Sequence, residues 1–193
     1  MKKILYFICA IILILLALAI FDIIRLKNIK YNQPELLSGK KILTVYFSNS
    51  GITKNIANSI HSTVGGDIEE IQLLEKYPNN PYEMSKTVRK QIKEGELPEI
   101  ASINISDYDI IFVGSPVWLF NVSLPAKAFL KNNNFENKTI VPFFTCGAYA
   151  NKNKLANEIE TLAGSKDVKN LLLLHANELF LSEKRVINWL NRI

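Results

Sequence analysis

The sequence predicts an α/β fold: a doubly wound parallel sheet of five strands with helices on both faces, preceded by a transmembrane helix. Short apolar runs rich in β-branched residues alternate five times with helical patterns, which is typical of a parallel sheet covered by helices. The run at 109–114 contains four consecutive apolar residues, as expected for a strand buried on both faces. A long uncharged segment at the N-terminus sets the start of the chain apart from this pattern.

Composition and charge narrow the classes of protein that fit. The chain has 193 residues, about one domain plus a short appendage, and 48% of them are hydrophobic, which excludes a disordered chain. The net charge of +5 comes mainly from residues 1–30, which carry five basic side chains and one acidic one. Residues 31–193 therefore carry 18 basic and 17 acidic side chains. A nearly neutral domain lacks the basic surface for nucleic acid, so we expect no such partner.

The cysteine and histidine content excludes two further classes. Two cysteines, Cys9 and Cys146, cannot form the disulfide framework of a small secreted domain. With only two histidines and no Cys-x-x-Cys pair, we expect no metal site.

The N-terminal segment has the pattern of a membrane anchor. Residues 4–21 contain no charge, glycine or proline, and with Ile23 and Ile24 the segment approaches the roughly 20 residues that cross a bilayer. We expect an anchor at 1–27 that contacts the cell membrane through 4–24. Basic residues stand on both sides of the span, so a count of positive charges does not decide its orientation. The first residues resemble those of a signal anchor, which favours a single-pass anchor with the domain outside the cytoplasm. The alternative is a cleaved signal peptide with a small-x-small site at Ala17 and Ala19.

A polar tether at 28–40 joins this anchor to a domain at 41–193. Within the domain, short apolar runs mark the strands and amphipathic patterns mark the helices. We expect strands at 42–47, 67–73, 109–114, 139–145 and 168–174, and helices at 53–63, 82–95, 125–132, 151–163 and 182–193. Ligands of such sheets bind at the carboxyl ends of the strands, so the loops after the first, third and fourth strands are candidates.

The first of these loops, Ser48–Thr53, has the composition of an anion site. Three hydroxyl side chains, an amide and a glycine precede a predicted helix whose first N–H groups point outward, which can hold a phosphate. Lys54, in the first turn, opposes the helix dipole, and a bound anion would remove that conflict. The alternative is that Ser50 or Thr53 caps the helix.

The other two loops offer groups that could hold a planar ring. We expect Gly114 and Pro116 to turn the chain off the third strand and to present Trp118 from a loop, where it could stack on a ring system; core packing is the alternative. In Thr145–Tyr149, Gly147 allows a close approach of the backbone, and Tyr149 is a second ring partner.

These loops resemble the flavin-binding loops of the flavodoxin family. The segment V-Y-F-S-N-S-G-I-T-K-N-I-A is similar to the phosphate loop, [ST]-x-[ST]-G-x-T. Y-D-I-I-F-V-G-S-P-V-W and F-F-T-C-G-A resemble the second and third flavin loops, and residues 75–100 resemble the region after strand two in short flavodoxin-like proteins. The resemblance covers about residues 41–193 and rests on ordered motifs. It implies a flavodoxin-like sheet and FMN as cofactor.

The resemblance also implies a role for each residue at the three loops. Around the phosphate it places Ser48, Asn49, Ser50, Gly51, Ile52 and Thr53. Beside the isoalloxazine it places Pro116, Val117, Trp118 and Phe120, with Trp118 stacking on it. Along the pyrimidine edge and the other face it places Thr145, Cys146, Gly147 and Tyr149. Because flavin carries the redox chemistry, no catalytic acid, base or nucleophile is expected. Cys146 is interpreted as a small loop residue without a redox partner, and His175 as a surface or boundary residue.

The predicted function is electron transfer by a membrane-tethered, FMN-binding protein whose partner is a redox protein or a small electron acceptor. The nearly neutral domain lacks the acidity of many flavodoxin carriers. This argues against a carrier of very low potential and leaves room for an alternative, an FMN-dependent NAD(P)H:quinone-type reductase. A third alternative is a flavin-free interaction module that retains the fold.

Overall fold

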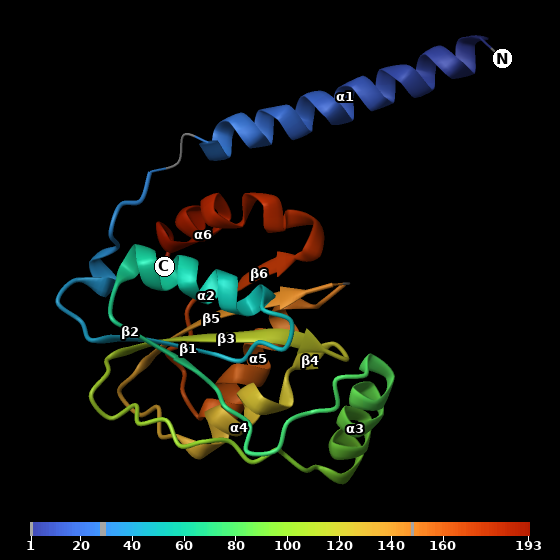
Figure 1. Cartoon of the computed structure of the whole chain (residues 1–193). Helices are drawn as coiled ribbons and strands as arrows, with labels where there is room; N and C mark the ends of the chain where they lie inside the picture. Colours follow the sequence, from blue (N-terminus) through green and yellow to red (C-terminus); the bar gives the residue numbers. More distant parts are fainter. Residues whose placement is uncertain (1, 28–29, 148) are drawn as a thin grey trace.

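A computed structural model describes residues 2–27, 30–147 and 149–193. Its centre is a sheet in which five parallel strands lie in the order β2-β1-β3-β5-β6 (Figure 1). The bounds are β1 (Ile42–Tyr46), β2 (Asp67–Glu70), β3 (Ile110–Trp118), β5 (Thr139–Cys146) and β6 (Leu172–His175). This order is that of the flavodoxin-like doubly wound sheet, with its change of winding direction between β1 and β3. The predicted α/β fold, a flavodoxin-like parallel sheet with helices, is confirmed.

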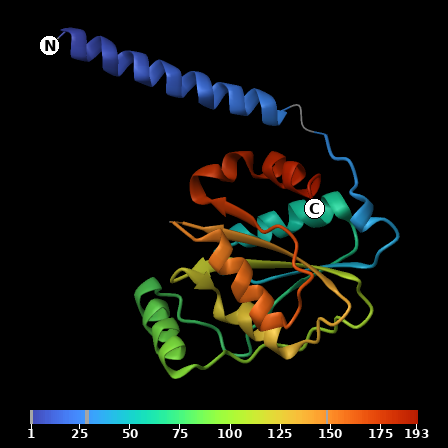
Figure 2. The same cartoon turned by 180° about the vertical axis from the view of Figure 1, so that it is seen from behind.

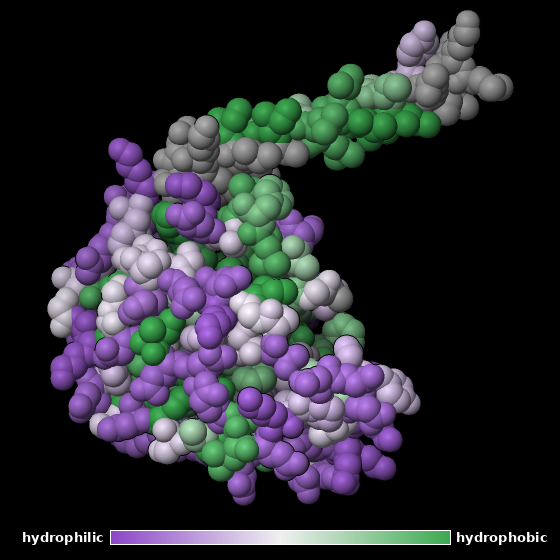
Figure 3. Space-filling model, in the orientation of Figure 1, coloured by the Kyte–Doolittle hydropathy of each residue, from purple (hydrophilic) through white to green (hydrophobic). Residues whose placement is uncertain are grey.

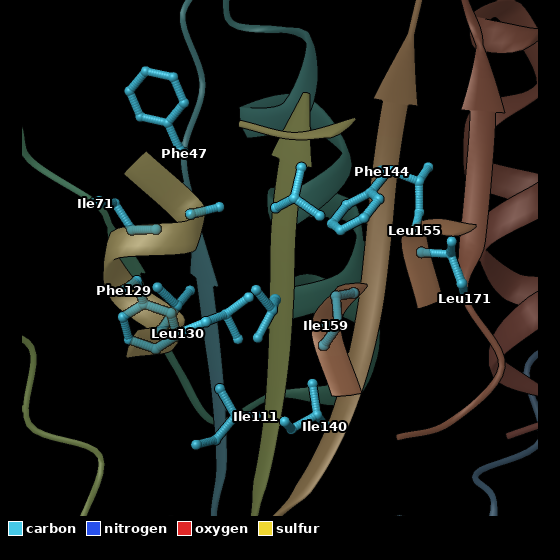
Figure 4. Packing of buried hydrophobic residues seen from close by; sticks show 14 of the residues in the cluster. Phe47, Ile71, Ile111, Phe129, Leu130, Ile140, Phe144, Leu155, Ile159 and Leu171 are labelled. Atoms are coloured by element: carbon cyan, nitrogen blue, oxygen red, sulfur yellow. The ribbon is translucent and has the colours of Figure 1, made fainter. Parts of the chain in front are cut away.

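Helices cover both faces of this sheet (Figures 1 and 2). One face packs on α2 (Ile52–Val64) and α6 (Ser182–Leu190), and the other packs on α4 (Leu124–Asn132) and α5 (Lys152–Ala163). Figure 4 shows the second core, where residues of α4 and α5 meet alternate strand residues. A further helix, α3 (Pro81–Glu94), lies beside the carboxyl end of the sheet and contributes one buried residue, Val88.

The sheet has six strands, so the expected count of five is wrong by one. The sixth, β4 (Asn121–Val122), pairs antiparallel with the end of β3. The predicted loop at Gly114–Asn121 is therefore a strand that continues to Trp118 and turns back over two residues. Leu119 and Phe120 adopt left-handed conformations, with φ of 49° and 64°. Their position is that of a type I′ hairpin turn.

Other boundaries also differ from the prediction. The strand expected at 67–73 ends at Glu70, and the helix expected at 182–193 ends at Leu190. The strand expected at 168–174 begins at Leu172, because Val168 makes only an isolated bridge with Ile140. After β6 the chain forms an unpredicted 3-10 segment, η2 (Ala176–Leu181), before α6.

The N-terminal segment forms one helix, α1 (Lys2–Lys27), which projects away from the domain and exposes apolar side chains (Figures 1 and 3). Among the helices of the described residues, none combines the length and hydropathy that crossing a membrane requires. The predicted transmembrane helix, with its membrane contact through 4–24, is therefore not supported.

Residue 1 of the predicted anchor and residues 28–29 of the predicted tether lie outside the described residues. The rest of the tether packs on the domain. It contains a 3-10 turn, η1 (Glu35–Leu37), whose Leu37 is buried against the α2 and α6 face. The backbone N–H of Asn32 donates to Asn191 at 2.9 Å, which joins this segment to the end of the chain.

Candidate functional site

A cavity of about 210 Å³ lies at the carboxyl ends of β3, β5 and β6. All three loops singled out in the sequence contribute to its walls, because the carboxyl ends of parallel strands share one edge of the sheet. Its lining residues are Ser50, Ile52, Pro116, Val117, Trp118, Thr145, Cys146, Gly147, Leu174, Ala176 and Leu179. The structure thus brings together residues of the three predicted groups.

The loop before α2 keeps its donors available for a ligand. Gly51 occupies the N-cap position with φ of 84°, and no described side chain caps the helix. Neither Ser50 nor Thr53 serves as the cap, so the capping alternative is not supported. The first N–H groups of a helix need acceptors from outside it, and an anion supplies them.

Ser48 carries the clearest sign of a missing partner. Its hydroxyl oxygen is buried and has no hydrogen-bond partner among the described residues. A buried hydroxyl without a partner loses its hydration and gains nothing in return. A phosphate oxygen at this loop would accept the Ser48 proton, so the residues present fit a phosphate-bearing ligand.

Lys54 and Thr53 have roles other than those expected. Lys54 donates to Glu70 of β2 at 3.0 Å, and this hydrogen bond and charge raise the Lys54 pKa, so its charge needs no anion at the loop. Thr53 is buried, and its Oγ1 lies 2.8 Å from Oγ1 of Thr145. This hydrogen bond joins the phosphate-type loop to the end of β5, and we assign Thr53 a positioning role.

Trp118 packs partly on the core and also lines the cavity. Its ring meets those of Phe47 and Tyr77 edge to face, each with a centroid distance of 5.4 Å. The Phe47 contact ties it to the core, while its remaining surface lines the cavity. Tyr77 is itself held by a 2.8 Å hydrogen bond to Gln91, and burial raises its pKa to about 12. Trp118 is therefore a fixed wall of the site.

Gly114 and Gly147 serve different purposes. Gly114 lies within β3, not in a turn, and a Cβ there would collide with the Phe143 ring. It is required for packing between strands, and Pro116 likewise belongs to β3. Gly147 lines the cavity, and a Cβ there would meet no described atom within 4 Å.

Of the predicted site residues, six are not among those that line the cavity: Ser48, Asn49, Gly51, Thr53, Phe120 and Tyr149. Phe120, at the tip of the β3–β4 turn, is 59% exposed, and Tyr149 is 73% exposed. The placement of these rings beside a flavin is therefore not evident in this structure. Asn49 lines a different cavity, on the α3 side of Trp118.

Sequence reasoning missed the contribution of β6 and the segment after it. Leu174, Ala176 and Leu179 line the cavity. The available signal was the carboxyl end of the fifth predicted strand, which lies on the same edge as the others. His175 pairs with Cys146 across the sheet, and its Nδ1 lies 3.2 Å from Cys146 Sγ. Burial, with a smaller effect of Glu178, raises the pKa of the Cys146 thiol.

In the described ranges, no three His, Cys, Asp or Glu side chains gather as metal ligands would.

Comparison with known proteins assigns the domain to a family. The sequence profile of a family described as Flavodoxin matches residues 41–193, most of the chain. The chain belongs to the flavodoxin family. No significant match was found among curated proteins.

Solved structures agree with this flavodoxin assignment. A protein classed as a flavoprotein from Bacteroides uniformis ATCC 8492 has 25% identity and a TM-score of 0.68, over 80% of this chain and 100% of that one. A similar one from Bacteroides eggerthii DSM 20697 has 27% identity and a TM-score of 0.66, over 79% and 97%. A flavoprotein from Lactobacillus acidophilus NCFM, in complex with FMN, has 29% identity and a TM-score of 0.57, over 74% and 97%. The predicted family is confirmed, and FMN is supported as the cofactor.

Proposed function

We propose that this flavodoxin-family protein binds FMN in the cavity at β3, β5 and β6 and acts in electron transfer. The observation that carries the proposal is the meeting of an uncapped helix N-terminus, a buried unpartnered Ser48 hydroxyl and the Trp118 wall at one edge of the sheet. When bound, FMN supplies the redox chemistry through its ring system, and the protein supplies binding, orientation and electrostatics.

The phosphate contacts belong to the loop before α2. An anion at this loop accepts from the hydroxyls of Ser48 and Ser50 and from the first N–H groups of α2. Gly51 adopts the left-handed backbone conformation that the chain needs where it enters the helix. Lys54 is paired with Glu70, so no cation of this turn is needed. Neutral donors and the helix dipole hold the phosphate.

The ring contacts belong to Trp118 and to the end of β5. The indole is held edge-on by its neighbours and presents a rigid surface for stacking, worth about 1 kcal/mol beyond burial. Because Gly147 has no side chain, a bound ring can come close to the backbone on this side of the cavity. Ile52, Leu174 and Leu179 add apolar walls that exclude water from the ring.

The redox partner, a protein or a small acceptor, stays a prediction, as does the location of the domain outside the cytoplasm. The nearly neutral charge of residues 31–193 supports an acceptor that is not recruited by strong electrostatic steering.

Replacing Ser48 and Ser50 together by alanine tests the phosphate assignment. The double variant should bind FMN at least about a hundredfold more weakly, since each of the two hydrogen bonds to a charged group contributes about 1.5–3 kcal/mol. Riboflavin, which has no phosphate, should bind as it does to the parent chain. Flavin fluorescence titrations measure both affinities.

The control is Ser102→Ala, a change of the same kind at an exposed serine outside the cavity. Equal losses of FMN and riboflavin affinity would contradict the phosphate assignment. A folded chain that binds neither flavin would instead favour an interaction module that has kept the fold.

A further inference from the structure

A second cavity, of about 320 Å³, lies on the α3 side of Trp118. Val117 and Trp118 line both cavities, so these two residues form a common wall between the proposed FMN site and this compartment. The second cavity is lined by Asn49, Asn79, Pro81, Met84, Ser85, Val88, Val117, Trp118 and Leu119.

The lining defines the chemistry of a ligand. No charged side chain of the described residues lines the cavity, so a charged ligand would lose its hydration without a compensating partner. Most of the wall is apolar. The polar groups are the amides of Asn49 and Asn79 and the hydroxyl of Ser85, which can donate to carbonyl oxygens. The cavity fits an uncharged ring compound with carbonyl groups at its edge.

Asn49 has a donor with a weak partner. Its side-chain amide donates to the sulfur of Met84 at 3.5 Å, and a thioether is a poor acceptor. A carbonyl oxygen in the cavity would be a better one. The displaced Met84 sulfur could then contact the edge of an aromatic ring, which is a favourable contact of methionine.

Helix α3, which forms one wall of the second cavity, is held in place by hydrogen bonds whose side chains do not occupy the cavity. Asn80 caps α3 by accepting from the N–H groups of Tyr82 and Glu83, and the Tyr77 hydroxyl donates to Gln91. Only Val88 of α3 is buried. The helix is therefore fixed at its ends over the cavity instead of being packed down into it.

We propose that this cavity binds the electron acceptor, a neutral quinone, while FMN occupies the other side of Trp118. The role as acceptor site rests on the proposed function, whereas the binding itself does not require FMN. Reduced FMN, when bound, would supply the two electrons and two protons that convert the quinone to hydroquinone. The Trp118 indole lines both cavities and would stand between the two bound rings.

The experiment uses the full chain, with and without FMN, and 2-methyl-1,4-naphthoquinone as the probe. Met84→Glu places a carboxylate in the cavity, on a helix position that favours glutamate. It should weaken quinone binding at least tenfold in calorimetric titration and leave FMN affinity unchanged. Ile92→Glu, at an exposed position of the same helix outside the cavity, is the matched control and should change neither. Thermal melting verifies that both variants fold.

Several outcomes would overturn the proposal: quinone that competes with FMN, a Met84→Glu chain that binds quinone like the parent, or equal losses in both variants. Failure here is distinguishable from failure of the proposed function. FMN binding without saturable quinone binding contradicts only the acceptor site. The chain could instead fail to bind FMN but bind quinone in a way that Met84→Glu weakens. That result would support the cavity assignment and contradict the FMN proposal.

Discussion

Gly114 and Gly147 lie close to the same site but have opposite steric surroundings. A Cβ at Gly114 would collide with the Phe143 ring and press on Tyr46, whereas a Cβ at Gly147 would project into open space. Phe143 is buried in a close-packed core and cannot move aside without cost. The two positions therefore separate an effect on stability from an effect on the cofactor.

We expect Gly114→Ala to lower the free energy of unfolding by about 1–3 kcal/mol, the usual cost of overpacking a core. Gly147→Ala should leave the free energy of unfolding within about 0.5 kcal/mol of the parent value but weaken FMN binding, because the new methyl group enters the cavity. Denaturant unfolding and flavin titration measure the two quantities. Similar unfolding midpoints for the two variants would contradict this interpretation.

The surroundings of Cys146 determine the reactivity of its thiol. Its thiol is buried at the end of β5 beside His175, and burial raises the pKa of the thiol. The thiolate, which is the reactive form, is therefore scarce near neutral pH. Cys146 was expected to be a small loop residue, but it is the last residue of β5, and its contact with His175 was not anticipated.

Alkylation with iodoacetamide should accordingly be slow at Cys146 and should accelerate as the pH rises toward the raised pKa of the thiol. The exposed Cys9 serves as the internal comparison and should react faster throughout. Added FMN should slow the reaction of Cys146 further, because Cys146 lines the cavity. Mass spectrometry after timed labelling gives both rates. A Cys146 rate equal to that of Cys9 at pH 7.5 would refute the buried, protonated thiol.

At the scale of elements, the β3–β4 hairpin was the main departure from the predicted strands. Its turn places two bulky residues in left-handed conformations that favour glycine and asparagine. Contacts from α5 hold it: Lys154 donates to the Phe120 carbonyl and the Asn121 side chain, and Glu158 accepts from the Val122 N–H. A two-residue strand has no periodicity that the sequence could reveal, because it exists only through its pairing.

Phe120→Gly should relieve the left-handed strain and raise the free energy of unfolding by about 0.5–1 kcal/mol. FMN affinity should stay unchanged, because the Phe120 side chain is exposed and does not line the cavity. Thermal melting and flavin titration provide the measurements. A clear loss of FMN affinity would restore Phe120 to the set of ring contacts that the family resemblance implied.

At the scale of the whole molecule, the domain and the N-terminal helix are distinct in their packing. Residues of α1 expose large apolar side chains, among them Tyr6, Phe7 and Leu13, while the core lies on the two faces of the sheet. Such a concentration of exposed apolar surface is unusual in a protein that has no partner.

Removal of residues 1–29 should therefore leave the melting temperature of the domain and its FMN affinity unchanged. It should also reduce self-association in water, because the exposed apolar surface of α1 is lost. Calorimetry, flavin titration and sedimentation measure the three effects. A large loss of domain stability would show that α1 packs on the domain more tightly than its exposed side chains indicate.

The sequence determined the order of strands and helices, the family and the three loops, because apolar periodicity and local motifs are properties of neighbouring residues. Only the tertiary structure decided which distant groups meet. It brings the side chain of Lys54 into contact with Glu70, that of Thr53 with Thr145, and that of Cys146 with His175. It also placed α3 against Trp118 to form the second cavity, since that contact depends on where a helix lies against a sheet edge and no local pattern encodes it.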